Sequence, residues 1–123
     1  MKIVQVLQSR GVEVTVTENA TKEIERFQDA HISYALSADE RTGVIFFGGF
    51  QEKRDAGLAF HHVAVLKGED IMEDIISAYN HARSKSDMIF ASSSPSKSAD
   101  IEGKLIFGMH GPKRFTVIVE VRK

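Results

Sequence analysis

Apolar residues recur most regularly in residues 69–84, where Ile71, Ile75, Ala78 and Ala82 follow the spacing of one helical face. Acidic residues open this segment and basic residues close it, the charge order that complements a helix dipole. We therefore predict one long amphipathic helix whose apolar stripe packs on a sheet. Its acidic residues are expected on the solvated side, namely Glu69, Asp70, Glu73 and Asp74.

Shorter apolar patterns predict strands. Residues 12–17 alternate valine with polar residues, which is typical of a strand with one buried face. Residues 2–7 are apolar at both odd and even positions and predict a strand covered on both sides. A glycine-containing turn joins this strand to the one at residues 12–17, so the two form a predicted hairpin. Residues 32–36 and 44–47 predict a second hairpin around a polar turn.

The remaining segments complete the set of elements. A short helix is expected from Asn19 or Thr21, either of which can cap it, to about residue 30. The last strand is expected to be central or well packed, because Phe115, Val117, Val119 and Val121 share one face. The further predicted strands cover residues 58–66, 88–91, 104–110 and 114–122.

These elements predict a single α+β domain over residues 1–123, with a mostly antiparallel sheet covered by two helices. The order strand-helix-strand-strand occurs twice and is similar to the duplicated modules of gyrase-inhibitor-like small-molecule-binding domains. A ferredoxin-like arrangement is the alternative. Residues 50–57 and 92–100 are rich in charged residues or serine and predict flexible loops.

Composition narrows the class of protein. The chain is 42% apolar and 27% charged, has no cysteine, and balances 16 Lys and Arg against 17 Asp and Glu. This near-neutral charge argues against nucleic acid as a partner. We see neither an apolar run that could span a membrane nor a signal peptide, so we expect a cytoplasmic protein without disulfides.

The turn before the last strand contains the best candidate for a binding site. His110, Lys113 and Arg114 surround a Gly-Pro pair and could hold a phosphate or carboxylate. A solvated turn is the simpler interpretation of the same residues. No phosphate-binding loop and no dinucleotide fingerprint is present, so we predict no cofactor.

The histidines offer an alternative, catalytic interpretation. His61 and His62 are adjacent in a predicted strand, so they point to opposite faces and cannot chelate one metal together. We predict no metal site. A small hydrolase could instead use His62 or His110 as a general base on an ester or phosphoester, with Arg114 stabilising negative charge.

We favour a non-enzymatic binding or regulatory module. We expect a homo-oligomer that binds a protein partner or a small anionic ligand, for example a nucleotide-like one, because no catalytic constellation is recognisable and several predicted strands could pair across subunits. The phenylalanines, including Phe60, are expected in the core. An exposed phenylalanine beside Arg114 would indicate a nucleotide or another planar anion.

Overall fold

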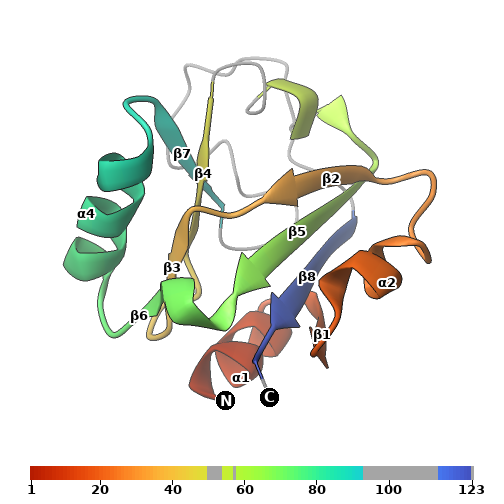
Figure 1. Ribbon diagram of the computed structural model, residues 1–123, viewed down its shortest axis with the longest axis horizontal. Coiled ribbons are helices and arrows are strands. Elements are labelled where there is room, and N and C mark those ends of the chain that lie inside the picture. Colours follow the sequence, from red (N-terminus) through yellow and green to blue (C-terminus); the bar gives the residue numbers. More distant parts are fainter. Residues whose placement is uncertain (50–53, 57, 93–113, 123) are drawn as a thin grey trace.

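The computed structural model describes residues 1–49, 54–56, 58–92 and 114–122 of the chain. Helices and strands follow one another along the sequence (Figure 1). Their bounds are α1 Lys2–Ser9, β1 Glu13–Thr17, α2 Ala20–Ile24, β2 His31–Tyr34, β3 Ser37–Asp39, β4 Ile45–Gly48, β5 His61–Lys67, the 3-10 helix η1 Gly68–Asp70, β6 Ile71–Met72, α4 Ile75–Lys85, β7 Ile89–Ser92 and β8 Arg114–Glu120.

The first sheet, sheet A, has the strand order β1-β8-β5-β2, and all of its neighbouring strands are parallel. Val117 of β8 lies opposite Val14 of β1 on one side and Ala64 of β5 on the other. The two central strands are buried along most of their length. Parallel strands covered on both faces have such continuous apolar sequences, which explains the composition of β5 and β8.

The second sheet, sheet B, has the order β6-β3-β4-β7 and is mixed. β4 pairs antiparallel with β3 and β7, whereas β3 pairs parallel with β6. The predicted mostly antiparallel sheet is therefore wrong, and so is the ferredoxin-like alternative. The sequence pattern marked extended segments, but their direction depends on connections that the pattern does not specify.

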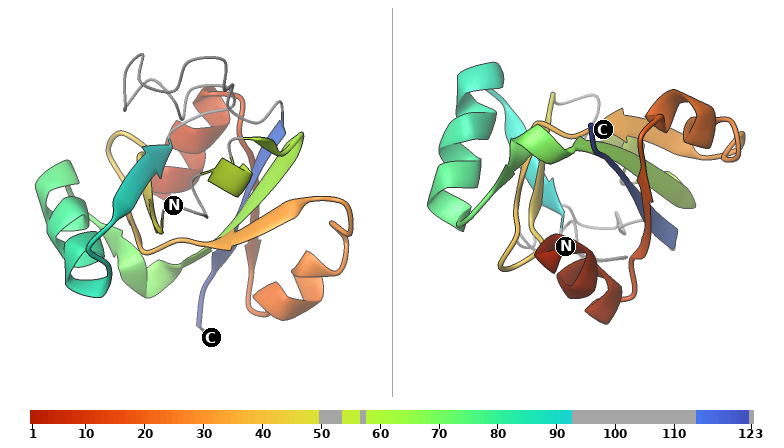
Figure 2. Two further views of the ribbon diagram at one scale, coloured as in Figure 1. Left: turned by 90° about the horizontal axis from the view of Figure 1, so that it is seen from above. Right: turned by 60° about the horizontal axis from the view of Figure 1, so that its bottom comes forward.

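Apolar layers hold the two sheets and the helices together. Ala20 of α2 packs against Val63, Val65 and Ile118 on one face of sheet A. The other face of sheet A packs against sheet B and α1, and the fully buried Phe47 lies in this main core. α4 covers the outer face of sheet B, so α2 and α4 lie on opposite sides of the two sheets (Figure 2).

The predicted N-terminal hairpin is also wrong, because residues 2–9 form α1. Ile3 and Leu7 are one helical turn apart, and both are buried. The helix ends in a Schellman motif, in which the N–H groups of Gly11 and Val12 bind the carbonyls of Gln8 and Leu7. Gly11 has a φ of 82°, which suits glycine at this position.

The long predicted helix is shorter than expected at its start. α4 begins after Asp74, whose carboxylate accepts a hydrogen bond of 2.8 Å from the Ser77 N–H. The preceding residues form η1 and β6, and β6 pairs with β3. Asp70 was expected on a solvated face, but it is only 7% exposed. Conversely, Ile75 of the predicted apolar stripe is 39% exposed.

The other predicted elements have mixed outcomes. β5, β7 and β8 confirm three predicted strands with shifted ends, and β8 lies inside sheet A as expected. β3 and β4 form an antiparallel hairpin, but β2 belongs to sheet A. The short helix is confirmed as α2, which Asn19 caps, but it ends at Ile24 instead of near residue 30. The predicted strand 104–110 and most of the predicted loops 50–57 and 92–100 lie outside the described residues, although residues 54–56 are helical.

Candidate functional site

The chain leaves β1 and β5 toward opposite faces of sheet A. After β1 it forms α2, which covers the face that contains Val63 and Ile118. After β5 it passes through η1 into β6 of sheet B, on the face that contains Ala64 and Leu66. β8 lies between these two strands. Ligands of open α/β sheets bind where connections diverge in this way, at the carboxyl ends of the strands.

An open cleft of about 650 Å³ lies at these strand ends. β5 and β8 point to the same edge of the molecule, so their last residues meet there (Figure 1). Lys67 and Glu120 are direct neighbours in the pairing of these two strands. The residues that line the cleft are Glu18, Lys67, Gly68, Glu69, Glu120, Val121 and Arg122.

The charged groups of the cleft differ in how firmly they are held. The Glu120 carboxylate accepts a hydrogen bond of 2.9 Å from the Ala20 N–H, so it is fixed. Arg122 Nη2 lies 3.7 Å from Glu69 Oε1, and the two side chains are 90% and 60% exposed. This pair is too long for a hydrogen bond and contributes little stability. Within the described ranges, no ion pair or hydrogen bond occupies the Lys67 ammonium.

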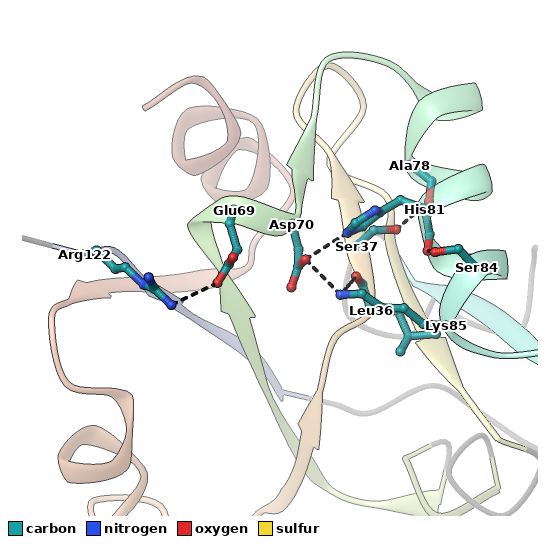
Figure 3. Close-up of polar contacts among 9 residues, drawn as sticks. All are labelled: Leu36, Ser37, Glu69, Asp70, Ala78, His81, Ser84, Lys85 and Arg122. Carbon is teal, nitrogen blue, oxygen red and sulfur yellow. Dashed lines mark hydrogen bonds and ion pairs between the residues drawn. The ribbon is translucent and has the colours of Figure 1, made fainter.

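A second polar cluster lies beside the cleft, on the other side of η1. Glu69 reaches toward Arg122, whereas Asp70 reaches toward His81 and Lys85 of α4 (Figure 3). Asp70 Oδ1 lies 2.9 Å from His81 Nε2 and 2.8 Å from Lys85 Nζ. The Lys85 ammonium also donates to the carbonyl of Leu36. The cluster therefore links α4 to η1, which directly follows β5, and to the backbone at Leu36, which directly precedes β3.

Comparison with known proteins identifies the family. The family model for the LUD domain matches residues 57–119, which is just over half of the chain. The chain belongs to the LUD domain family. The matched part includes Lys67 and Glu69 of the cleft and the whole Asp70 cluster apart from Leu36.

A solved structure extends the likeness of this LUD domain to nearly the whole chain. The crystal structure of a DUF162 family protein from Deinococcus radiodurans at 1.70 Å resolution superposes with a TM-score of 0.68 and 15% sequence identity. The alignment covers 98% of this chain and 96% of that one. This likeness supports the parallel and mixed sheets described above. No curated protein matches the chain.

The Asp70 cluster of this LUD domain gives a direct stability prediction. Asp70→Asn removes the negative charge but keeps the side-chain shape, and it should lower the free energy of unfolding by about 1–2 kcal/mol. The estimate is modest because the His81 and Lys85 side chains are 33% and 37% exposed and can be rehydrated. Urea denaturation of the purified variant measures the change.

Glu69→Gln is the matched control for this prediction. It makes the same chemical change at the neighbouring residue, but it removes only the long, exposed pair with Arg122. We expect its effect to stay within about 0.5 kcal/mol. Equal losses in the Asp70 and Glu69 variants would contradict the proposed difference between the buried and exposed carboxylates.

Arg114, one of the residues predicted to bind an anion, is the first residue of β8. It therefore lies at the amino ends of the strands of sheet A, away from the cleft at their carboxyl ends. Its Nε and Nη2 donate hydrogen bonds of 3.0 and 2.9 Å to the two carboxylate oxygens of Glu13. This pairing lowers the pKa of Glu13 below its ordinary value. The predicted companions of Arg114, Lys113 and His110, lie outside the described residues.

The histidine pair has the predicted alternating orientation. His61 contacts Phe27 on the α2 side, whereas His62 stacks on Phe115 with ring centroids 5.1 Å apart. His62 is 2% exposed, and its Nε2 lies 2.7 Å from Ser33 Oγ. Burial lowers the pKa of His62 to about 3, so its ring is neutral at pH 7. A substrate in solvent cannot reach this ring, so the geometry gives no support to His62 as a general base.

Sequence reasoning did not identify the cleft at the carboxyl ends. The apolar patterns place Lys67 directly after one predicted strand and Arg122 at the end of another, and they assign neither residue to a site. A usable signal was present, since each residue follows a continuous apolar strand, but only a parallel pairing brings the two strand ends together. In the described part of the chain, no three His, Asp or Glu side chains gather into a metal-binding group, and no helix could span a membrane.

Proposed function

We propose that this LUD domain is a non-enzymatic binding module that holds a small anion in the cleft at the carboxyl ends of β1, β5 and β8. The observation that carries this proposal is the state of the two cations in the cleft. Among the described residues the Lys67 ammonium has no bound partner, and Arg122 makes only a long, exposed ion pair. Both cations can therefore turn to a ligand at little cost.

The chemistry of the cleft favours a small, singly charged carboxylate. The Arg122 guanidinium can offer two parallel N–H donors, and Lys67 adds a compact positive charge. Three carboxylates, from Glu18, Glu69 and Glu120, line the same cleft and would repel a polyanion. Membership of the LUD domain family suggests a link with lactate utilization. That link is part of this proposal, and lactate is the first carboxylate to test.

Titration with lactate, followed through backbone amide chemical shifts, tests the site. The largest shift changes are expected at Gly68 and Val121, which line the cleft next to the two cations. Lys67→Ala and Arg122→Ala should each weaken binding about fivefold, because each removes an exposed charge interaction of ~1 kcal/mol. Phosphate, titrated in the same way, should bind more weakly than lactate at neutral pH.

Arg83→Ala is the control variant for this titration. Arg83 is also an exposed cation, but it lies on α4 and donates to the hydroxyl of Tyr79, away from the cleft. Its removal should leave the lactate affinity unchanged. Shift changes that spread evenly over the molecule, or an equal loss in the Arg83 variant, would reject the proposed cleft.

The predicted self-association and protein partner also belong to the proposal. The outer face of α4 exposes Ile76 and Tyr79, which are 70% and 43% exposed. Native mass spectrometry of the purified chain gives its subunit number and the mass of any retained ligand in one measurement. A bare monomer would remove the homo-oligomer from the proposal.

A further inference from the structure

A second cleft, of about 550 Å³, lies at the amino ends of the strands of sheet A, where β5 and β8 begin. Three rings line it, those of Phe27, Phe60 and His61. Two guanidinium groups, from Arg26 and Arg114, belong to the same lining. This aromatic and cationic composition differs from the charged cleft at the carboxyl ends, and it plays no part in the function proposed above.

Phe60 is the unusual residue of this cleft. Its side chain is 66% exposed, although phenylalanine is ordinarily buried. The Phe60 carbonyl accepts a hydrogen bond of 3.0 Å from the Arg114 N–H, so the exposed ring and the guanidinium belong to neighbouring backbone positions. An exposed phenylalanine beside Arg114 is the combination that indicates a nucleotide or another planar anion. The Phe60 ring offers a flat apolar surface on which such a ligand can stack.

The other rings of the cleft are held in place. Phe27 and His61 meet edge to face with centroids 5.5 Å apart, and the Arg26 guanidinium lies 5.6 Å from the centre of the Phe27 ring. Burial and the charge of Arg114 lower the pKa of His61, so His61 is neutral at pH 7. Neutral His61 therefore adds no positive charge, which suits an uncharged ring better than a polyanion.

One edge of the Arg114 guanidinium binds Glu13, and its other N–H donors are available to a ligand. Its Nε and Nη2 bind the Glu13 carboxylate at 3.0 and 2.9 Å, which fixes the plane of the guanidinium. A guanidinium has five N–H donors, so both donors of Nη1 and one of Nη2 remain outside this pairing. Two adjacent acceptors on a planar ligand match such an edge, as O6 and N7 of guanine do.

Carboxylates in the same lining supply acceptors. Glu25 and Asp29 follow α2 in the chain and also line this cleft. Their negative charge is opposite to that of the two arginines in the lining. The cleft therefore combines a stacking ring, a fixed pair of N–H donors and carboxylate acceptors. A planar heterocycle with adjacent acceptors on one edge and N–H donors on the other complements all three, and among common biological rings guanine has this arrangement.

We propose that the cleft beside Phe60 binds a guanine base. The base stacks on the Phe60 ring and presents O6 and N7 to the free edge of the Arg114 guanidinium. Its N1–H and amino group donate to a carboxylate of Glu25 or Asp29. The base can belong to a free nucleotide or to a single strand of RNA, since both present the same ring and edges.

Calorimetric titration with guanosine monophosphate tests this proposal on the intact chain. Phe60→Ala should weaken binding about 5- to 150-fold, the range expected when one stacked base loses its aromatic partner. Leu58→Ala is the matched control, because Leu58 is equally exposed at 68% but does not line the cleft. Phe60→Tyr keeps a flat ring and should retain most of the affinity.

Further ligands show whether the base or the phosphate is recognised, and whether the base belongs to a free nucleotide or to RNA. Adenosine monophosphate lacks the O6 acceptor and should bind at least tenfold more weakly than the guanosine nucleotide. Tighter binding of a guanine-containing single-stranded tetranucleotide would identify RNA as the source of the base. Equal binding of ribose 5-phosphate, no binding of the guanosine nucleotide, or unchanged binding by the Phe60→Ala variant would overturn the proposal.

Discussion

Acidification from about pH 7.5 to about pH 5 should lower the free energy of unfolding by about 2 kcal/mol through His62 alone. The pKa of this ring falls from 6.5 to about 3 in the folded protein, chiefly because the ring is buried. Between these two pH values His62 is protonated in the unfolded chain but stays neutral in the folded protein. Stability is therefore complete above about pH 6.5 and decreases as the pH falls toward 3.

The surroundings of His62 explain why protonation is disfavoured. The ring stacks on Phe115 at a centroid distance of 5.1 Å and contacts the tilted Phe47 ring at 5.2 Å, and neither phenylalanine can solvate a cation as water does. His31 lies 5.7 Å away, and it and His61 would add positive charge when protonated. Within the described part of the chain the ring forms one hydrogen bond, with Ser33 Oγ, which is itself buried.

Urea denaturation at several pH values measures this dependence. The double variant His62→Leu with Ser33→Ala replaces both hydrogen-bond partners by apolar groups and leaves no unpaired polar atom. Its stability should vary less with pH than that of the natural chain, by about 2 kcal/mol over the same interval. The comparison concerns the slope, so a general loss of stability in the variant does not affect it. Parallel pH profiles would refute the assignment to His62.

Phe47→Ala should lower the free energy of unfolding by about 3–5 kcal/mol, the range typical of large aromatic truncations in a core. Phe47 is fully buried in the cluster that joins sheet A, sheet B and α1. Its ring stacks on Phe90 at a centroid distance of 5.2 Å and also contacts His62. Truncation would leave a cavity between two sheets, and rigid sheets cannot readily close around it.

Phe60→Ala is the matched control, because it makes the same substitution at a ring that is 66% exposed. Its free energy of unfolding should change by no more than about 0.5 kcal/mol. Both values come from chemical denaturation of the two purified variants under one set of conditions. Similar losses in the two variants would contradict the described positions of these rings.

The candidate sites were only partly accessible to sequence reasoning. Arg114 was selected because it follows a Gly-Pro turn, and it does line a cleft. Its partner Glu13 is 101 residues away, and only the pairing of β1 with β8 brings the two together. Lys67 and Arg122 were passed over for the same reason, since their cleft forms from three strands that are distant in the chain.

The sequence by itself determined where several elements lie and which of them are buried. The apolar residues of β8 indicated a well-packed strand, and the alternation in β1 indicated an extended segment. Asn19 is a local helix cap that was predicted from the sequence, because capping depends on short-range hydrogen bonding. Such signals depend on neighbours in the chain.

Only the tertiary structure decided strand direction, sheet membership and the composition of the clefts. β2 and β3 are separated by two residues, yet they belong to different sheets. Strand direction follows from long connections whose path depends on the packing of α2, α4 and sheet B. Ile71 and Met72 continue a helical pattern in the sequence, but pairing with β3 makes them a strand. The free energy of these long-range contacts outweighs local preference, and for that reason the sequence pattern did not reveal them.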